Sequence, residues 1–280
     1  ADMQLIAESY LLLKYVGGFN NQELAHIFKS WNEGELHSYL IGITAGIFRE
    51  ADDLGDGELI DRIKDSAKQK GTGRWASIEA LKQGVDISMI TSACTARIMS
   101  NHLDEREKAW QLIHSPAVGL SPDKESFAAM VREALYTGKI IAYAQGFSLM
   151  QDASRLYGWN LDLGKIASIF RAGCIIQAVF LNDITHAFEA EPKPENLIFD
   201  GFFLSRINEH QDSLRQAVST GVMNGLPIPA LCNAVSYLDE FRAKAAGANL
   251  IQAQRDCFGA HTYERTDREG VFHHEWRWAN

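Results

Sequence analysis

Apolar positions recur at helical spacing along most of the chain. In the stretch 126–150, spacings of three, four, seven and eight separate Phe127, Val131, Ala134, Leu135, Ile141 and Leu149. Such spacing places side chains on one face of an α-helix. Alternating apolar and polar runs joined by Asn-Gly turns, which are typical of strands, are scarce. The pattern predicts an all-α fold.

Capping residues, glycines and prolines mark the predicted helix boundaries. Asn21 and Asp123 each precede an apolar-periodic run and are predicted N-caps. Gly17-Gly18 and Gly225 stand where helices should end. The first 115 residues contain no proline, which permits helices throughout, and all six prolines fall in three places: 116 and 122, 192 and 194, and 227 and 229.

A row of small residues lies on the helix predicted over 126–150. Gly138, Ala142 and Gly146 follow one another at intervals of four, so they share one helix face. Such a row lets a neighbouring helix approach closely, although any one of these glycines could also be a tolerated surface residue.

The chain resembles itself at an offset of about 140 residues. The segment Gly18–Phe28 is similar to Gly158–Phe170, which predicts two related helical units over roughly 1–115 and 123–258. A chance match of amphipathic helices is the alternative. The remaining residues, 259–280, look irregular or extended and are predicted to form a C-terminal tail.

Composition and charge narrow the function classes. The 280 residues are 46% hydrophobic with a net charge of −9, so nucleic acid and anionic membranes are poor candidates for partners. The chain has no apolar run of about 18 residues and no basic leader at its start. The four cysteines are widely separated and form no CxxC pair. A soluble, cytoplasmic protein is expected.

Two stretches carry candidate chemistry. In Gln69–Trp75 (QKGTGRW), two glycines, a threonine and two cations precede a predicted helix start, a combination that suits an anion. The spacing is neither that of a P-loop nor that of a dinucleotide fingerprint, and a solvated basic turn stays open. In Asn249–His261, Arg255 and His261 could contact an anion. The alternative there is a helix that ends at Gly259 with an Arg–Asp surface pair.

Other polar residues carry less chemistry. Arg97 lies in a small, apolar helical stretch, where a lone arginine usually extends to solvent or pairs with a carboxylate. His273-His274 lacks the spacing of a zinc-binding HExxH motif, and no metal site is expected. No nucleophile motif of the GxSxG or Cys–His type is found.

Several segments together resemble one enzyme family. DMQLIAESY, SAKQKGTGRW, ALYTGKIIAYAQGF, IFRAGCII and NLIQAQRDCFGAHTYER are similar to segments in the C-terminal helical part of decarboxylating 6-phosphogluconate dehydrogenases. The resemblance spans essentially the whole chain, and the last motif is highly specific.

The resemblance implies roles for five residues. Lys70, Thr72 and Arg97 match positions that bind the substrate phosphate in this family. Arg255 and His261 match residues that reach across a homodimer interface into the partner's site, and the tail is expected to extend through the partner subunit.

The resemblance also implies oxidation of 6-phosphogluconate by NADP and decarboxylation to ribulose 5-phosphate. The family's catalytic lysine and glutamate lie just before the DMQ motif, so no catalytic residue is expected in this chain. NADP is expected to bind mainly to a preceding nucleotide-binding domain, and this chain alone is expected to be inactive.

Two alternatives remain. One is a non-catalytic helical dimerisation or interaction protein with the same fold, which would have no need of all five matched residues. The other, a related β-hydroxyacid dehydrogenase domain, is disfavoured because such domains are shorter and lack the QRD…GAH segment.

Overall fold

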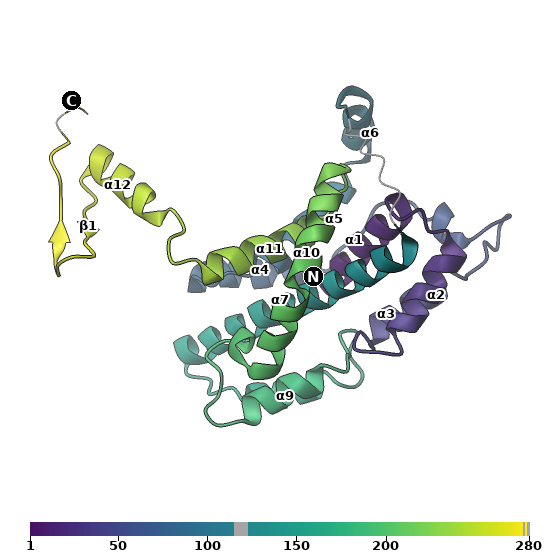
Figure 1. The fold of residues 1–280 in the computed structure, drawn as a ribbon, viewed down its shortest axis with the longest axis horizontal. Helices are drawn as coiled ribbons and strands as arrows, with labels where there is room; N and C mark the ends of the chain where they lie inside the picture. Colours follow the sequence, from purple (N-terminus) through teal and green to yellow (C-terminus); the bar gives the residue numbers. More distant parts are fainter. Residues whose placement is uncertain (115–122, 277, 279–280) are drawn as a thin grey trace. The chain divides into compact units, whose positions relative to one another are not determined.

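The computed structural model describes residues 1–114, 123–276 and 278. Contacts divide the chain into two compact units, Ala1–Val235 and Ser236–Asn280. The described residues form twelve α-helices, two short 3-10 helices and one pair of two-residue strands (Figure 1). The predicted all-α fold is confirmed.

The first unit contains the helices α1 to α11 and both 3-10 helices. In chain order they are α1 (Asp2–Tyr15), α2 (Asn21–Trp31), α3 (Tyr39–Ile47), η1 (Leu59–Arg62), α4 (Thr72–Gln83), α5 (Ser88–Ser100), α6 (Leu103–Leu112), α7 (Lys124–Tyr157), α8 (Leu163–Ile169), α9 (Leu181–Glu189), η2 (Leu197–Phe199), α10 (Gly201–Met223) and α11 (Pro229–Arg242), which runs on into the second unit.

The 34-residue helix α7 forms the centre of the first unit. Every residue from 134 to 145 is buried, and α1 and α10 pack against this helix. A methyl group added at Gly138 would lie 3.0 Å from a Leu5 methyl carbon of α1, so the predicted close approach is confirmed there. Nothing lies within 4 Å of the same position at Gly146, where the prediction is wrong.

The predicted N-caps hold at one helix and shift by one residue at another. Asp123 Oδ2 accepts the Ser126 N–H at 2.9 Å, as predicted. Helix α2 is capped by Asn20 rather than Asn21: Asn20 Oδ1 accepts the Glu23 N–H at 2.9 Å, and the Glu23 carboxylate accepts the Asn20 N–H at 2.8 Å. This reciprocal capping box requires a glutamate three residues after the cap, which favours Asn20.

Residues 48–71 depart from the helices that the lack of proline permitted. Only η1 is helical here. The acidic, glycine-containing run from Ala51 to Glu58 folds back on itself, with those two residues forming an antiparallel bridge and Gly57 at φ +97°. Glycine supplies this backbone angle without steric cost. This long loop ends at the start of α4.

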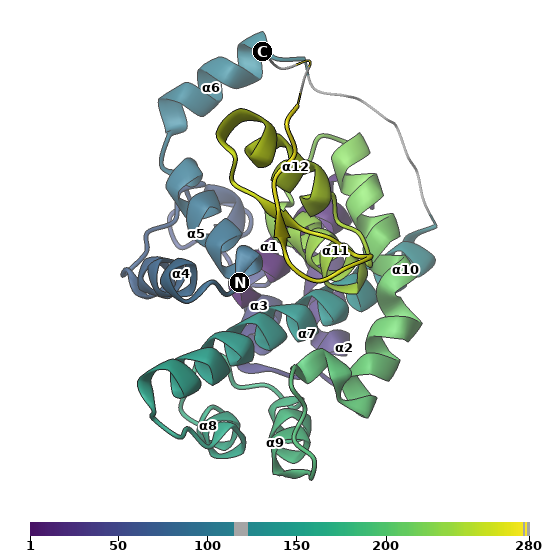
Figure 2. The same cartoon turned by 90° about the vertical axis from the view of Figure 1, so that its left-hand side faces the viewer.

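The two similar segments occupy equivalent places in the helix order. The series α1–α2–α3 recurs as α7–α8–α9, with Gly18 and Gly158 following the first helix at φ +65° and +66°. Ser38, before α3, bridges Ala178, before α9, in an antiparallel pair. Figure 2 shows α8 and α9 side by side, and α2 and α3 likewise contact each other. The presence of two related units stays a prediction, and the repeated order of helices supports it.

The described prolines lie outside the interiors of the helices. Those at 192 and 194 lie between α9 and η2, Pro227 lies between α10 and α11, and Pro229 is the first residue of α11. The positions 116 and 122 lie outside the described residues. Within the described chain, no helix is both long enough and apolar enough to cross a membrane.

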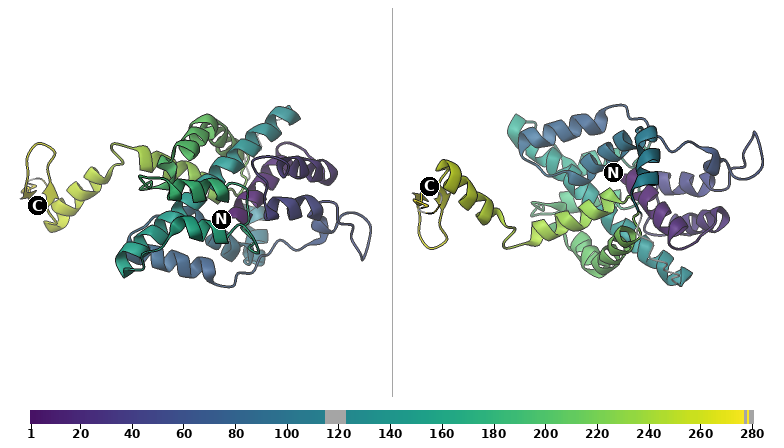
Figure 3. Two further views of the ribbon diagram at one scale, coloured as in Figure 1. Left: turned by 90° about the horizontal axis from the view of Figure 1, so that it is seen from below. Right: turned by 90° about the horizontal axis from the view of Figure 1, so that it is seen from above.

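The second unit contains α12 (Ala248–Gly259) followed by β1 (Tyr263–Glu264) and β2 (Val271–Phe272), coloured yellow in Figure 3. The strands pair antiparallel, with Tyr263 opposite Phe272. The predicted extended tail is therefore a small hairpin with irregular flanks in its described part. Contacts group α12 with this tail, and the predicted domain boundary after 258 stays a prediction.

Candidate functional site

The QKGTGRW stretch forms the start of α4. Gly71 is the N-cap residue at φ +99°, and the helix begins at Thr72, three residues before the start predicted at Trp75. Among the residues that the structure describes, no side chain caps this helix N-terminus. The first backbone N–H groups of a helix have no partner within the helix, and with the helix dipole they favour an anion. The start of α4 thus offers uncommitted donors beside the exposed Lys70 and Thr72.

Helix α4 packs closely on α5 along its first two turns. A methyl group added at Gly73 would lie 2.4 Å from Cys94 Sγ, and the hydroxyl groups of Ser77 and Thr91 are 2.9 Å apart. The start of α4 therefore faces the second half of α5. Arg97 follows Cys94 by one helical turn, so its turn of α5 lies beyond the N-terminus of α4.

Hydrogen bonds hold the loop before α4 against the end of α5. Ala67 N–H donates to Ser100 Oγ at 3.0 Å, and Ser66 Oγ donates to Asn101 Oδ1 at 2.8 Å. The chain then runs from this anchor to Gly71. Lys70 and Thr72 are thereby brought to the same end of the α4–α5 pair as Arg97, whose side chain contacts Met3 of α1.

Positive charge at this end has no carboxylate partner. Within the described parts of the chain, neither Lys70 nor Arg97 forms an ion pair, and the half-buried Arg97 only approaches Met3, with its Nη2 3.8 Å from the sulfur. Of the two outcomes expected for a lone arginine, pairing with a carboxylate is therefore wrong here. Two unpaired cations beside open backbone donors can bind a small multivalent anion.

In the second unit, α12 presents Arg255 next to a fixed turn. Arg255 Nη1 donates to Gln252 Oε1 at 3.3 Å, and both Arg255 and His261 are exposed. The His261 ring lies over Gly259, where a methyl group would come within 2.8 Å of its Nε2. Helix α12 ends at Gly259, as expected. The arginine and the histidine lie on one short segment and both face solvent within this unit.

The alternative for this stretch, a surface ion pair between Arg255 and Asp256, is wrong. Asp256 is fully buried and accepts hydrogen bonds from Thr262, His273, His274 and Trp276 at 2.8–3.1 Å. Burial raises the pKa of this carboxyl, but these donors outweigh it and hold the pKa below its ordinary value. Asp256 remains ionised at neutral pH and ties the tail to α12.

Comparison with known proteins places the whole chain in one family. The family described as 6-phosphogluconate dehydrogenase, C-terminal domain, matches residues 1–276. The chain belongs to this family. A 6-phosphogluconate dehydrogenase, decarboxylating, of Lactococcus lactis is 50% identical over 98% of this chain, and one of Staphylococcus aureus is 48% identical over 99%.

A solved 6-phosphogluconate dehydrogenase structure has the same fold. The enzyme of Plasmodium falciparum, described in its apo form and in complex with its cofactor NADP+ and its substrate 6-phosphogluconate, superimposes with a TM-score of 0.94 at 42% identity over 98% of this chain. This chain spans 58–59% of the length of these relatives.

Sequence reasoning missed four buried ionisable side chains of this 6-phosphogluconate dehydrogenase domain. Lys139 of α7 and Asp2 of α1 form an ion pair at 3.0 Å, and Glu8 and Asp256 are both fully buried. A lysine inside the apolar run ALYTGKIIAYAQGF was the available signal for Lys139. The partners of Glu8 and Asp256 are remote in sequence or irregular in structure, which hides them from pattern analysis.

Glu8 joins α1 to the start of α11. Its carboxylate accepts the N–H groups of Ala230 and Leu231, each at 2.8 Å, and the side-chain amide of Gln4 at 3.0 Å. Burial raises the pKa of Glu8 to about 7, and these hydrogen bonds only partly oppose the rise. The carboxylate serves as a remote N-cap and fixes α11 against the core.

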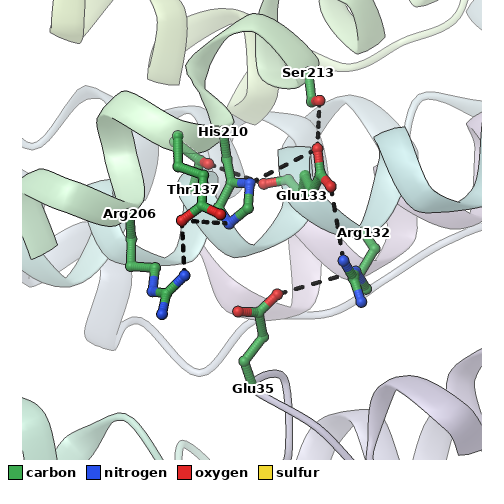
Figure 4. A network of polar contacts seen from close by, with 8 residues as sticks. Glu35, Arg132, Glu133, Thr137, Arg206, His210 and Ser213 are labelled. Atoms are coloured by element: carbon green, nitrogen blue, oxygen red, sulfur yellow. Dashed lines mark hydrogen bonds and ion pairs between the residues drawn. The ribbon is translucent and has the colours of Figure 1, made fainter. Parts of the chain in front are cut away.

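A second polar cluster fastens α10 to α7 (Figure 4). Ser213 Oγ donates to Glu133 Oε2 at 2.6 Å, and the buried His210 places its Nδ1 3.7 Å from the same oxygen. Arg132 extends the cluster from Glu133 to Glu35. These residues join two packed helices and a loop, an arrangement that stabilises the core.

Among the described residues, no group of three or more histidine, cysteine, aspartate or glutamate side chains could hold a metal ion. The His273 ring and the His274 backbone N–H instead form hydrogen bonds with the Asp256 carboxylate. All four cysteines are free and half-buried.

Proposed function

We propose that this chain provides the substrate-phosphate site and the dimer interface of a decarboxylating 6-phosphogluconate dehydrogenase. The observation that carries the proposal is the convergence of Lys70, Thr72 and Arg97 on one end of the α4–α5 pair, in a chain related over its full length to such enzymes. The substrate is 6-phosphogluconate and the oxidant is NADP.

The three residues suit a phosphate dianion. Lys70 brings a compact ammonium group, and Arg97 brings a planar guanidinium that can donate two parallel hydrogen bonds. Thr72 adds a hydroxyl group beside the open backbone N–H groups of the first turn of α4. In a chain with a net charge of −9, this local positive charge selects a small anion that fits the turn rather than an extended polyanion.

Arg255 and His261 complete the active site of the partner subunit in a homodimer. Both side chains are exposed within their own unit, which leaves them available to a second protomer. The tail 259–280 extends through that protomer. No nucleic acid and no membrane take part, and the enzyme works in the cytoplasm.

The reaction removes a hydride from C3 of the substrate and a proton from its hydroxyl group, which leaves a 3-keto acid and reduced cofactor. The C1–C2 bond then breaks, CO2 leaves, and the electron pair moves toward the carbonyl to form an enediol. Protonation at C2 of the substrate, which becomes C1 of the product, gives ribulose 5-phosphate. The lysine and glutamate that exchange these protons are expected upstream of Ala1. Bound NADP accepts the hydride, and no residue of this chain is assigned to the cofactor.

The chain's own contribution is binding and orientation. A phosphate held at the far end of the sugar fixes where C3 lies relative to the reacting groups, and such positioning lowers the barrier by restricting motion. Binding energy at the phosphate therefore contributes to the chemistry at a distance.

A direct test compares this 280-residue chain with the full-length dehydrogenase. We expect light scattering to give a dimer for both, and NADP-dependent turnover of 6-phosphogluconate only for the longer protein. Turnover by the 280 residues alone would refute the placement of the catalytic groups. A dimer with no turnover in either protein would favour the alternative, a non-catalytic helical dimerisation protein.

A further inference from the structure

We propose that Asp256 and Gln252 are positioning residues that set the geometry of Arg255 and His261 before substrate arrives. The inference rests on the proposed function, because it concerns the groups assigned there to the partner's site. Its basis is the hydrogen bonding around α12 and the turn that follows it, all within the second unit.

The turn at His261 is held in an unfavourable backbone conformation. Ala260 and Thr262, on either side of the histidine, have φ values of +50° and +59°. A non-glycine residue in this left-handed region costs about 1 kcal/mol or more, and a β-branched threonine is an unusual occupant. Such backbone strain persists only where surrounding contacts determine the conformation.

Asp256 supplies those contacts. Its backbone carbonyl accepts the Ala260 N–H at 2.9 Å, and its Oδ1 accepts the Thr262 N–H at 3.0 Å. One residue thus bonds both left-handed residues and brackets the histidine between them. The charged carboxylate makes the bond from Thr262 stronger than a bond to a neutral acceptor.

The same carboxylate also holds the tail in place. Oδ1 accepts a second bond from His273 Nδ1 at 2.8 Å, while Oδ2 accepts the His274 N–H at 3.1 Å and Trp276 Nε1 at 2.9 Å. These bonds, with that from Thr262, use the four acceptor positions of a carboxylate. No capacity is left for Arg255 next to it, so the guanidinium remains free for an external anion.

Gln252, one turn earlier on α12, links the arginine to the histidine turn. Its Oε1 accepts the Arg255 Nη1 bond, and its Nε2 donates to the carbonyl oxygens of His261 and Thr262. The side-chain amide of Gln252 therefore contacts both the Arg255 side chain and the turn that carries His261. Restricting them beforehand lowers the entropy lost on binding.

The experiment is a double-mutant cycle in the full-length dehydrogenase, with KM for 6-phosphogluconate, kcat and KM for NADP measured for each variant. The variants are Asp256→Asn, His261→Ala and the two combined. Asp267→Asn is the matched control, because Asp267 is an exposed carboxylate of the same unit that pairs only with arginines of its own loop. We expect Asp256→Asn to raise the KM for 6-phosphogluconate about tenfold, with little change in kcat or in the KM for NADP.

The combined variant distinguishes positioning from general loss of structure. If Asp256 acts through His261, the combined variant should have about the same KM as His261→Ala alone. Hydrogen exchange should also quicken at the Thr262 amide in Asp256→Asn and stay unchanged in the Asp267→Asn control. If Asp256→Asn does not fold, Gln252→Ala replaces it in the same cycle with the same expected pattern.

The outcomes separate this inference from the proposed function. If His261→Ala raises the KM while Asp256→Asn and Gln252→Ala do not, or if the effects are additive, the positioning role is overturned and the proposed function stands. If His261→Ala leaves the KM unchanged, the assignment of the histidine to the substrate site fails, and the positioning role falls with it.

Discussion

The ammonium group of Lys139 lies 3.0 Å from the carboxylate of Asp2, and the two side chains are 0% and 8% exposed. The pair joins the first turn of α1 to the middle of α7, although neither Asp2 oxygen accepts a well-directed hydrogen bond. Removing one partner of a buried ion pair leaves the other charge uncompensated.

We predict that Lys139→Met lowers the free energy of unfolding by about 3–5 kcal/mol. Lys14→Met is the control, because Lys14 pairs with the half-exposed Asp61 and a pair of that kind contributes about 1 kcal/mol or less. Urea denaturation measures both. An equal loss of unfolding free energy in the two variants would contradict the prediction that the buried Lys139–Asp2 pair contributes more than an exposed pair.

Glu8 should make stability depend on pH. Its pKa rises from 4.5 to about 7 on folding, so the folded state holds the proton more tightly than the unfolded state does. The free energy of unfolding therefore falls as pH rises from about 4.5 to about 7, by roughly 1.4 kcal/mol per unit of pKa shift, and then levels off.

The Glu8→Gln variant tests this dependence, since it removes the titrating group at a similar size. Between pH 5 and pH 8, the free energy of unfolding should fall less in the variant than in the unaltered chain. The same pH dependence in both proteins would mean that another group is responsible.

Gly73→Ala should disturb the start of α4. The added methyl group would lie 2.4 Å from Cys94 Sγ, and overpacking of this kind costs about 1–3 kcal/mol. Because α4 must shift, the KM for 6-phosphogluconate should rise as well. Gly146→Ala is the matched control, a helical glycine with open space around it.

A second substitution identifies the cause of that loss. Cys94→Ala removes the sulfur that the methyl group would meet, so combined with Gly73→Ala it should restore part of the stability measured by thermal unfolding. No recovery in the double variant would show that the close approach of the two helices is not what demands glycine.

Arg255→Ala in the full-length enzyme should raise the KM for 6-phosphogluconate, because a hydrogen bond to a charged group contributes about 1.5–3 kcal/mol. Arg242→Ala is the control: Arg242 is an exposed arginine of the same unit that pairs with Asp239. An unchanged KM in Arg255→Ala would remove this arginine from the site.

Helical periodicity and capping chemistry were sufficient to predict the fold class and the long helix α7. They act within a few residues of sequence, so Asp123 could be assigned directly as the N-cap of α7. The shift from Asn21 to Asn20 arises because two adjacent asparagines can each cap, and only the position of Glu23 decides between them.

Tertiary contacts set the limit of such reasoning. Gly138 and Gly146 look alike in sequence, yet only Gly138 has a helix against it. The burial of Asp256 depends on donors 6 to 20 residues away in an irregular tail that has no periodic pattern. The sequence resemblance could name Arg255 and His261, whereas the residues that hold them required the structure.

If the start of α4 binds the substrate phosphate, the KM for 6-phosphogluconate in Lys70→Ala reports on that contact most directly. Lys82, which is also exposed and lies at the opposite end of the same helix, provides the matched control Lys82→Ala. We predict that this KM rises about tenfold or more in Lys70→Ala and does not change in Lys82→Ala. An unchanged KM in a folded Lys70→Ala enzyme would contradict it.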